Sequence, residues 1–224
     1  MPSRLRPTSS VAADAILVGD PGRALLLAQE LLEQPKMSNH ARGLWGYGGR
    51  TPAGRELTIQ ATGMGGPSAS IVLADLVELG VERTVRIGTC VAIEPQPSPG
   101  DLLVVLEAHA WGGSGTGEAI LPDSGLTARL RDELGATSTA RPAIVASLDV
   151  LHQGGADESP HYADRVDAAD MQTATLLARA DALGISIAAL LIVAESASGE
   201  QADDDQVAAT AKRAGRAAAA LLST

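Results

Sequence analysis

The stretch Arg86-Ile87-Gly88-Thr89-Cys90 predicts a buried strand that brings an arginine to its end and then stops at a glycine. An arginine inside an apolar strand is costly unless a negative group meets it, because burial removes the charge from water. Gly88 permits a tight backbone and Thr89 adds a hydroxyl donor, so the stretch suits an oxyanion. A structural carboxylate paired with Arg86 would satisfy the same charge, and this stretch alone leaves both partners open.

The composition of the chain limits both its core and its ligands. With 224 residues, 45% of them hydrophobic, we expect one compact domain over residues 1–224. Aromatic residues make up 2% and Phe is absent, so the core must be aliphatic and few rings can stack on a planar ligand. The formal net charge of −10 argues against nucleic acid as a partner, because a phosphate backbone needs a basic face. Local arginines can still bind a small anion.

Cysteine content and hydropathy indicate where the protein works. Cys90 is the only cysteine, so no internal disulfide can form and a reducing compartment is expected. The N-terminus lacks an apolar segment of signal-peptide length, and the longest apolar run, residues 187–194, is too short to cross a membrane. We therefore expect a cytoplasmic protein without membrane contact. No Cys/His cluster suggests a metal site.

Two segments before the central stretch also contain arginine. Gly19-Asp20-Pro21-Gly22-Arg23 follows a predicted strand, Asp14–Val18, and leads into a predicted helix over residues 24–33. Asp at the N-cap and Pro at the first helical position are typical start signals. The free N–H groups of the helix start, together with Arg23, would form a phosphate cradle, although a plain capped turn explains the same residues. Arg42 precedes a predicted strand and could equally be an ordinary surface charge.

A second glycine-rich loop, residues 63–68, precedes a predicted helix that ends at Gly80. Its glycines would let the backbone approach a ligand closely, or simply make a tight strand-to-helix link. Met64 in this loop could cover an apolar ligand face, or serve as packing material.

The C-terminal half contains further strands, a helix and two acidic features. We predict strands over residues 101–107, 141–147 and 185–194, a surface helix over Ser124–Leu134, and an irregular acidic loop at residues 152–160 that is a candidate lid. Asp170 is the predicted N-cap of a helix that ends at Gly184. Glu195 ends a buried strand next to a loop, where a carboxylate suits a general acid or is merely solvated. Strands alternate with helices, which predicts an α/β fold with a largely parallel central sheet.

Five motifs occur along the chain in an order that resembles a known family. The motifs are Gly19-Asp20-Pro21-Gly22-Arg23, Arg42-Gly43, residues 63–68, Arg86-Ile87-Gly88-Thr89 and Asp170-Met171-Gln172. Their spacing resembles that of the purine nucleoside phosphorylase and uridine phosphorylase family, and the run that starts at Arg86 looks closer to the uridine phosphorylase branch. The resemblance covers nearly the whole chain. It implies a three-layer αβα sandwich with a mixed, largely parallel sheet. It also implies a homo-oligomer, usually a hexamer built from dimers.

The resemblance also assigns roles to individual residues. It implies that phosphate is held by Gly19, Arg23, Arg86 and Thr89, with Arg42 reaching in from the dimer partner. Met64 and Met171 would line the ribose, beside Gln172. Glu195 stands where purine-specific members have an aspartate that protonates the leaving base, so Glu195 and Arg86 are the expected catalytic residues. Inorganic phosphate would be the co-substrate, and neither a metal nor an organic cofactor is implied.

The nucleoside half of the family pattern is altered in this chain. Gln172 replaces the family glutamate that binds the ribose hydroxyls, and it retains hydrogen bonding without the charge. Gly155 and Asp157 fall where uridine phosphorylases read uracil, Ser3 and Arg4 stand in place of a histidine, and Leu151 replaces an aromatic.

These residues favour phosphorolysis of a purine nucleoside or uridine to free base and ribose 1-phosphate. Two alternatives remain. One is a nucleoside hydrolase of the methylthioadenosine nucleosidase type, which would have no use for the full arginine set. The other is a catalytically weak nucleoside- or phosphate-binding relative, motivated by Gln172.

Overall fold

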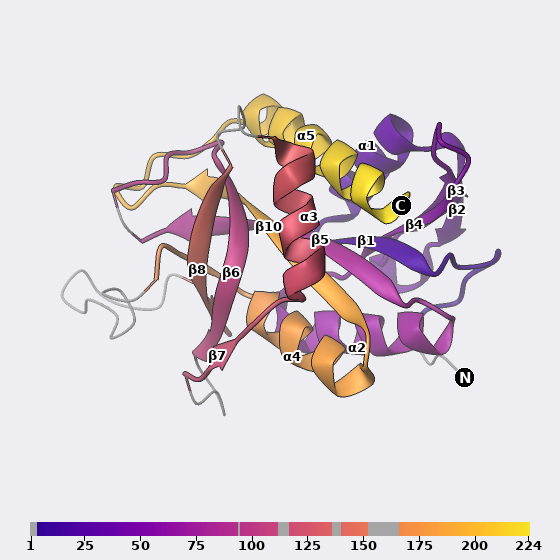
Figure 1. Ribbon diagram of the computed structural model, residues 1–224, viewed down its shortest axis with the longest axis horizontal. Helices are drawn as coiled ribbons and strands as arrows, with labels where there is room; N and C mark the ends of the chain where they lie inside the picture. Colours follow the sequence, from indigo (N-terminus) through magenta and orange to yellow (C-terminus); the bar gives the residue numbers. More distant parts are fainter. Residues whose placement is uncertain (1–3, 94, 112–116, 136–139, 152–165) are drawn as a thin grey trace.

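A computed structural model of the protein describes residues 4–93, 95–111, 117–135, 140–151 and 166–224. One mixed sheet lies between two helical layers, as Figure 1 shows. One face of the sheet is covered by α1 (Pro21–Leu31), α3 (Ser124–Leu134) and α5 (Asp204–Leu222), and the other by α2 (Gly65–Glu78) and α4 (Thr173–Leu183). This arrangement confirms the expected αβα layers.

The sheet has the strand order β10-β6-β8-β9-β5-β1-β4-β3-β2, with β7 paired to β6. Among the described residues, five strand pairs are parallel and five are antiparallel, and the centre β4-β1-β5-β10 is entirely parallel. A further pairing between β10 and β5 closes β5, β10, β6, β8 and β9 into a ring. The strands are β1 (Asp14–Val18), β2 (Glu33–Asn39), β3 (Gly46–Arg50), β4 (Glu56–Ala61), β5 (Arg83–Ala92), β6 (Leu102–Trp111), β7 (Ala119–Ile120), β8 (Arg141–Leu148), β9 (Ala168–Asp170) and β10 (Ser186–Glu195).

Small side chains replace aromatic ones in the core. Every residue of β1 is buried, as expected for a central parallel strand with helices on both faces. Alanines of α5, among them Ala214 and Ala218, are fully buried against α1. Gly215 is needed at this contact, because a Cβ there would lie 2.8 Å from the Cδ2 of Leu27. An aliphatic core without Phe therefore packs by letting the helices approach closely.

The first predicted helix differs from the observed one. α1 begins at Pro21, directly after the Asp20 N-cap, and ends at Leu31 rather than near residue 33. The following residues form a strand, β2, which the sequence did not predict. β2 is an edge strand paired only with β3, so its exposed polar residues and Pro35 are tolerated there.

Two predictions around the central stretch are also corrected. β5 does not stop at Gly88 but runs on to Ala92, because β10 pairs alongside it as far as Val91. Asp170 lies on the short strand β9, and Gln172 occupies the N-cap position of α4. The Asp170 carboxylate nevertheless accepts the Thr173 N–H at 3.1 Å, so it still satisfies the helix start.

Other local predictions are confirmed. The strand Asp14–Val18 and the helix Ser124–Leu134 lie where the sequence placed them. The structure also shows that Asp203 caps α5 in a reciprocal capping box with Gln206. The predicted lid at residues 152–160 lies outside the described residues.

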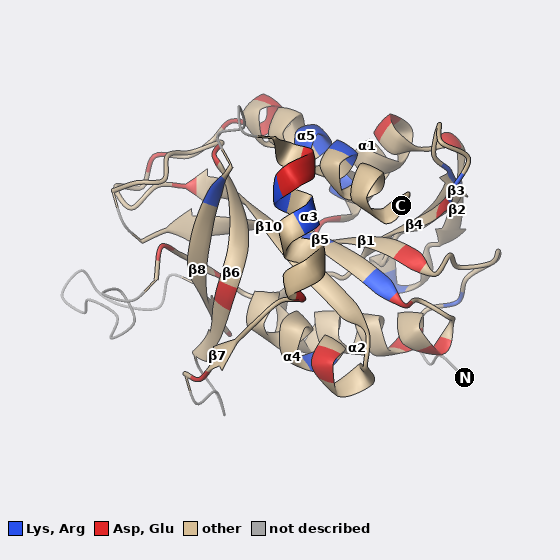
Figure 2. Cartoon of the chain, viewed as in Figure 1, with Lys and Arg blue, Asp and Glu red and all other residues tan. Residues whose placement is uncertain are grey.

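Figure 2 shows that basic and acidic residues occur together on α3 and α5. Within the described ranges, no helix is long and apolar enough to span a membrane. The same ranges hold no group of three or more His, Cys, Asp or Glu side chains placed to bind a metal ion.

Candidate functional site

A cavity of about 550 Å³ lies at the carboxyl ends of β1 and β5, where the two glycine-rich loops meet the end of β9. Ligands commonly bind at this edge of a parallel α/β sheet, because the strand ends leave a crevice between the loops. The cavity is lined by Gly19, Asp20, Pro21, Arg23, Gly63, Met64, Gly65, Arg86, Gly88, Thr89, Leu151, Met171 and Gln172.

Arg86 is bound on three sides by the protein itself. Its Nη2 lies 2.8 Å from Oδ2 of Asp170, in an ion pair whose side chains are 4% and 1% exposed. Its Nη1 donates to Oε1 of Gln172 at 2.7 Å, and its Nε donates to Oγ1 of Thr173 at 3.0 Å. A Cβ on Gly88 would lie 2.5 Å from Nη2, so glycine is required where the guanidinium packs against its own strand. The structural carboxylate considered from the sequence is therefore Asp170.

Asp170 is itself satisfied on both oxygens. The Ser147 hydroxyl donates to Oδ1 at 2.5 Å, and the Thr173 hydroxyl donates to Oδ2 at 2.6 Å. Ser147 in turn accepts the backbone N–H of Ala174 at 2.9 Å. A buried ion pair is stable only when its remaining donors and acceptors are met in this way. Burial among these groups also raises the pKa of the Cys90 thiol, with Asp170 adding to the effect, so the thiol stays protonated.

Arg23 differs from Arg86 in having no partner for its guanidinium among the described residues. Its backbone N–H donates to Oδ1 of Asp20 at 2.7 Å, which starts α1 beside the cavity. Partial burial lowers the pKa of Arg23, the Asp20 carboxylate opposes this shift, and the nearby charge of Arg86 adds to it. A partly desolvated cation beside a second cation and a helix N-terminus attracts an anion.

Gln172 ties the second glycine-rich loop to Arg86. Its Nε2 donates to the carbonyl oxygens of Gly63 at 2.5 Å and Gly65 at 3.3 Å. Its Oε1 accepts from Arg86 and lies 3.1 Å from the Thr62 hydroxyl. Gly63 has a φ of +73°, which favours glycine, so the loop conformation depends on this residue type.

Most of the predicted site residues come together, and two do not. Arg42 is exposed in the short helix η1 (Ala41–Gly43), with a left-handed φ of 60°, and it does not line this cavity. Glu195 ends β10, and it too is absent from the described lining. Leu151 lines the cavity at the place expected from the sequence, whereas Gly155, Asp157 and Ser3 lie outside the described residues. The predicted residues that line the cavity are Gly19, Arg23, Met64, Arg86, Thr89, Met171 and Gln172.

Sequence reasoning missed the support beneath Arg86. Ser147, Thr62 and Thr173 belong to none of the five motifs, and the sequence predicted Asp170 as a helix cap rather than as the partner of Arg86. One signal was available, since an arginine in an apolar strand requires a buried acceptor and Asp170 is the acidic residue of a conspicuous motif.

Comparison with known proteins places the chain in a family. The family model described as the phosphorylase superfamily matches residues 14–224. A DeoD-type purine nucleoside phosphorylase from Oceanobacillus iheyensis is 40% identical over 95 residues, which are 42% of this chain and 40% of that protein. Another from Caldanaerobacter subterraneus subsp. tengcongensis is 38% identical over 99 residues, 44% of this chain and 42% of that protein.

These curated relatives correct the expected closeness to the uridine phosphorylase branch, because they are purine nucleoside phosphorylases. The match spans about two-fifths of their length. One solved structure is the crystal structure of purine nucleoside phosphorylase from Toxoplasma gondii in complex with immucillin-H. It superposes on this chain with a TM-score of 0.83 at 24% sequence identity. The superposition covers 96% of this chain and 90% of that one, so the two proteins share the fold. Since the family model covers residues 14–224, the chain belongs to the phosphorylase superfamily.

Proposed function

We propose that this protein is a nucleoside phosphorylase that cleaves the N-glycosidic bond of a purine nucleoside with inorganic phosphate. The products would be the free base and a pentose 1-phosphate. The observation that carries the proposal is Arg23, a guanidinium without a protein partner among the described residues, which faces a cavity of about 550 Å³ beside Arg86. Such a group has donors left for an oxyanion, and the α1 N-terminus adds a favourable dipole.

The chemistry follows from this placement. A phosphate oxygen attacks the anomeric carbon while the bond from that carbon to the base nitrogen breaks, and the base takes up a proton as it leaves. Arg23 and the start of α1 would hold the phosphate in position, which supplies orientation as well as charge. The sugar passes through an oxocarbenium-like state, as in other glycosyl transfers. Met64 and Met171 offer apolar surface in the same cavity for the nucleoside.

A purine is the base that the comparisons favour, since both relatives described above are purine nucleoside phosphorylases. Glu195 remains the proposed general acid. It ends β10 and pairs with Val91 of β5, two residues beyond Thr89, so it would act from the rim of the cavity. A Glu195→Gln variant tests this role, because it retains hydrogen bonding and removes the proton donor. We expect lower kcat with little change in the KM for phosphate.

Arg42 supports a proposed homo-oligomer. It is exposed and lies outside the cavity of its own chain, as expected of a residue that completes the site of a neighbouring copy. Co-expression of Arg23→Ala with Arg42→Ala tests the proposal, since a mixed dimer would contain one site that has both arginines. Recovered activity supports sharing across the interface. If the co-expressed variants are no more active than either single variant, the proposal of a shared site is wrong.

A water-dependent hydrolase is the second candidate, and one observation favours it. Three nitrogens of Arg86 already donate to the protein, and Asp170 balances its charge. That leaves less positive charge for phosphate than two free arginines would give. A nucleosidase needs no positive charge to bind phosphate, so the dependence of base release on phosphate separates the two candidates.

The first experiment measures release of free base from inosine, adenosine, guanosine and uridine, with and without phosphate. Phosphate-dependent release that is fastest with a purine nucleoside supports the proposal. Release that does not depend on phosphate favours the hydrolase, and absence of release with every nucleoside removes both. Arg23→Ala is compared with Arg50→Ala, because Arg50 is an exposed arginine paired only with surface groups of its own hairpin. Only the first variant should raise the KM for phosphate.

A further inference from the structure

Asp20 is the one acidic residue in the described lining of the cavity, and the protein uses only one of its two carboxylate oxygens. Oδ1 accepts the backbone N–H of Arg23 at 2.7 Å, which starts α1. Gly22 leaves room for this contact, because a Cβ there would lie 3.0 Å from Oδ1. Oδ2 has no hydrogen-bond partner among the described residues. The capping bond therefore holds a carboxylate beside the cavity with one acceptor oxygen left for a ligand.

The two cations of the cavity are already matched by carboxylates. Arg86 is paired with Asp170 at 2.8 Å. Burial lowers the pKa of Arg23, and the charge of the Asp20 carboxylate opposes this shift, so these two groups interact as well. An anion that binds beside Arg23 therefore also meets the negative charge of Asp20. That charge repels an anion that brings acceptors alone, and it attracts one that brings a hydrogen-bond donor.

We infer, on the basis of the proposed function, that Asp20 selects an oxyanion that carries a proton, so that the site binds phosphate in preference to sulfate. Phosphate near neutral pH keeps at least one P–OH group, whereas sulfate is fully ionised and has only acceptors. The P–OH group would donate to Oδ2 of Asp20, while the other phosphate oxygens accept from Arg23 and the start of α1. Sulfate has nearly the same shape, but it would place a negative oxygen against the unpaired Oδ2, which costs binding free energy.

The same hydrogen bond orients the nucleophile. Asp20 accepts the bond and does not take the proton, so the proton stays on the phosphate oxygen that faces Oδ2. The oxygens that face the sugar are then unprotonated, as attack on the anomeric carbon requires. Binding of the correct anion and its alignment for the reaction would therefore depend on one carboxylate.

The test measures the binding of four tetrahedral anions by calorimetry, in a buffer that contains none of them. Phosphate and arsenate carry an O–H group near neutral pH, whereas sulfate and selenate carry none. Arsenate and selenate are both larger than phosphate and sulfate, so the panel separates protonation from size. We expect phosphate and arsenate to bind about tenfold or more tightly than sulfate and selenate. Equal affinity for phosphate and sulfate, or a preference that follows size alone, overturns the inference.

Asp20→Asn removes the charge and retains the helix cap. The amide oxygen still accepts the Arg23 N–H, and the NH₂ group then offers a donor to the anion. Sulfate and selenate should gain more affinity than phosphate and arsenate, so that the two pairs bind within about threefold of each other. The matched control is Asp203→Asn, because Asp203 caps α5 outside the described lining and accepts the Gln206 N–H at the same distance, 2.7 Å. It should leave all four affinities unchanged. A preference for protonated anions that Asp20→Asn does not lower, or that Asp203→Asn lowers equally, overturns the inference.

The proposed function fails separately, because these affinities do not depend on turnover. Phosphate-dependent release of base together with equal affinity for phosphate and sulfate removes only the selection by Asp20. Release of base without phosphate, together with a clear preference for the protonated anions, removes only phosphorolysis. If phosphate does not bind to the protein, both the inference and the proposed function are wrong.

Discussion

Arg23 and Arg86 line the same cavity, but the protein treats the two cations in opposite ways. Arg86 is almost fully buried, paired with Asp170 and bonded through three of its nitrogens. Arg23 has no side-chain partner among the described residues, and its pKa is lowered by burial. Both arginines belong to sequence motifs of equal prominence. Their surroundings divide the work between them, so that Arg86 organises the floor of the cavity and Arg23 remains available to an anion.

The contribution of a charged residue in a cavity depends on its partners. A buried guanidinium paired with a carboxylate contributes mainly to the stability of the fold, since its removal would strand the buried carboxylate. A guanidinium without a protein partner contributes little to the stability of the fold and more to the affinity for a ligand. Substitution of each arginine and of its neighbours separates the two contributions.

The largest effect is expected from Arg86→Ala. It would leave Asp170 as an uncompensated charge at 1% exposure, and we expect the free energy of unfolding to fall by about 3–5 kcal/mol. Urea denaturation measures this loss. Because the variant can fail to fold, the double variant Arg86→Met with Asp170→Leu provides a second measurement, and it should recover much of the stability since no charge remains buried.

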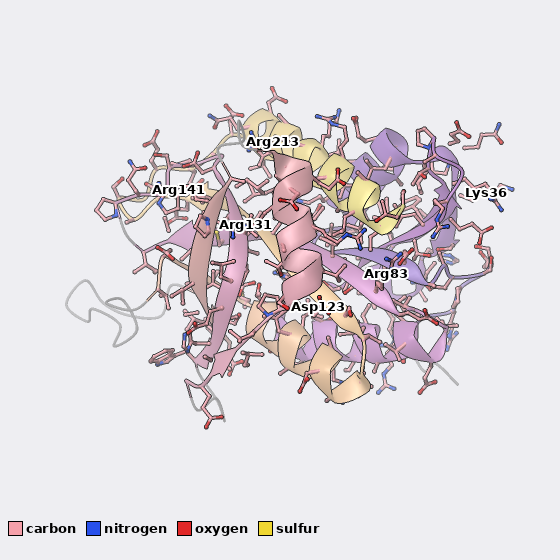
Figure 3. The ribbon with its side chains drawn as sticks, in the orientation of Figure 1. Lys36, Arg83, Asp123, Arg131, Arg141 and Arg213 are labelled. Atoms are coloured by element: carbon pink, nitrogen blue, oxygen red, sulfur yellow. The ribbon has the colours of Figure 1, made fainter. Side chains whose placement is uncertain are left out.

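The matched control is Arg83→Ala on the same strand, labelled in Figure 3. Arg83 forms a similar pair with Asp14, but its side chain is 29% exposed, and the hydrogen bond to Asp14 raises its pKa. Solvent screening weakens such a pair, so we expect a loss of about 1 kcal/mol. Equal losses for the two variants would contradict the assignment of Arg86 to the structural core.

Arg23→Ala should reverse this pattern. We expect a rise of about 10- to 100-fold in the KM for phosphate, because a hydrogen-bonded charge contributes about 1.5–3 kcal/mol to binding an anion. Stability should stay the same or increase slightly, since burial and the neighbouring Arg86 both disfavour this cation in the folded state. Steady-state kinetics and urea denaturation on one preparation check both parts. A clear loss of stability with an unchanged KM would show that Arg23 is structural.

Asp123→Ala removes a helix cap, and Figure 3 places Asp123 at the start of α3. The backbone N–H of Leu126 is the main cause of the lowered pKa of this carboxyl, and Ser186 adds a hydrogen bond. The loss should be about 1 kcal/mol at neutral pH. A lowered folded-state pKa means that this stabilisation is present above the unfolded pKa and is lost as pH falls through the folded value. The difference between variant and parent should therefore shrink as pH falls below about 4 and disappear only below the folded-state pKa of Asp123.

The smallest effect is expected from Asp20→Asn. Asparagine is as good an N-cap as aspartate, so the Arg23 N–H keeps its acceptor and stability should change by less than about 0.5 kcal/mol. The lost carboxylate no longer offsets the charge of Arg23. Phosphate should therefore bind more tightly, by about two- to fivefold, as for a surface charge interaction. Unchanged or weaker phosphate binding would mean that Asp20 does not oppose the anion.

The sequence predicted those elements whose signals are local. The helix over Ser124–Leu134 and the Asp20 cap depend on residues within a few positions of each other, and the structure confirms both. It failed for β2, an edge strand whose residues are mostly exposed and polar, and for β9, which is held by pairing with distant strands. β9 has three residues, too few for a periodic pattern, and exists because β5 and β8 lie on either side of it.

The pattern along the chain is sufficient to predict an arginine buried in a central strand, glycine-rich turns that lead into helices, and their meeting at one edge of an α/β sheet. The group that meets this arginine follows from the tertiary fold alone. Asp170 is 84 residues from Arg86, and Gln172 is 109 residues from the Gly63 carbonyl that it binds. Contacts at such separations leave no pattern along the chain. They form only when β9 closes beside β5, where burial makes each unpaired donor or acceptor costly.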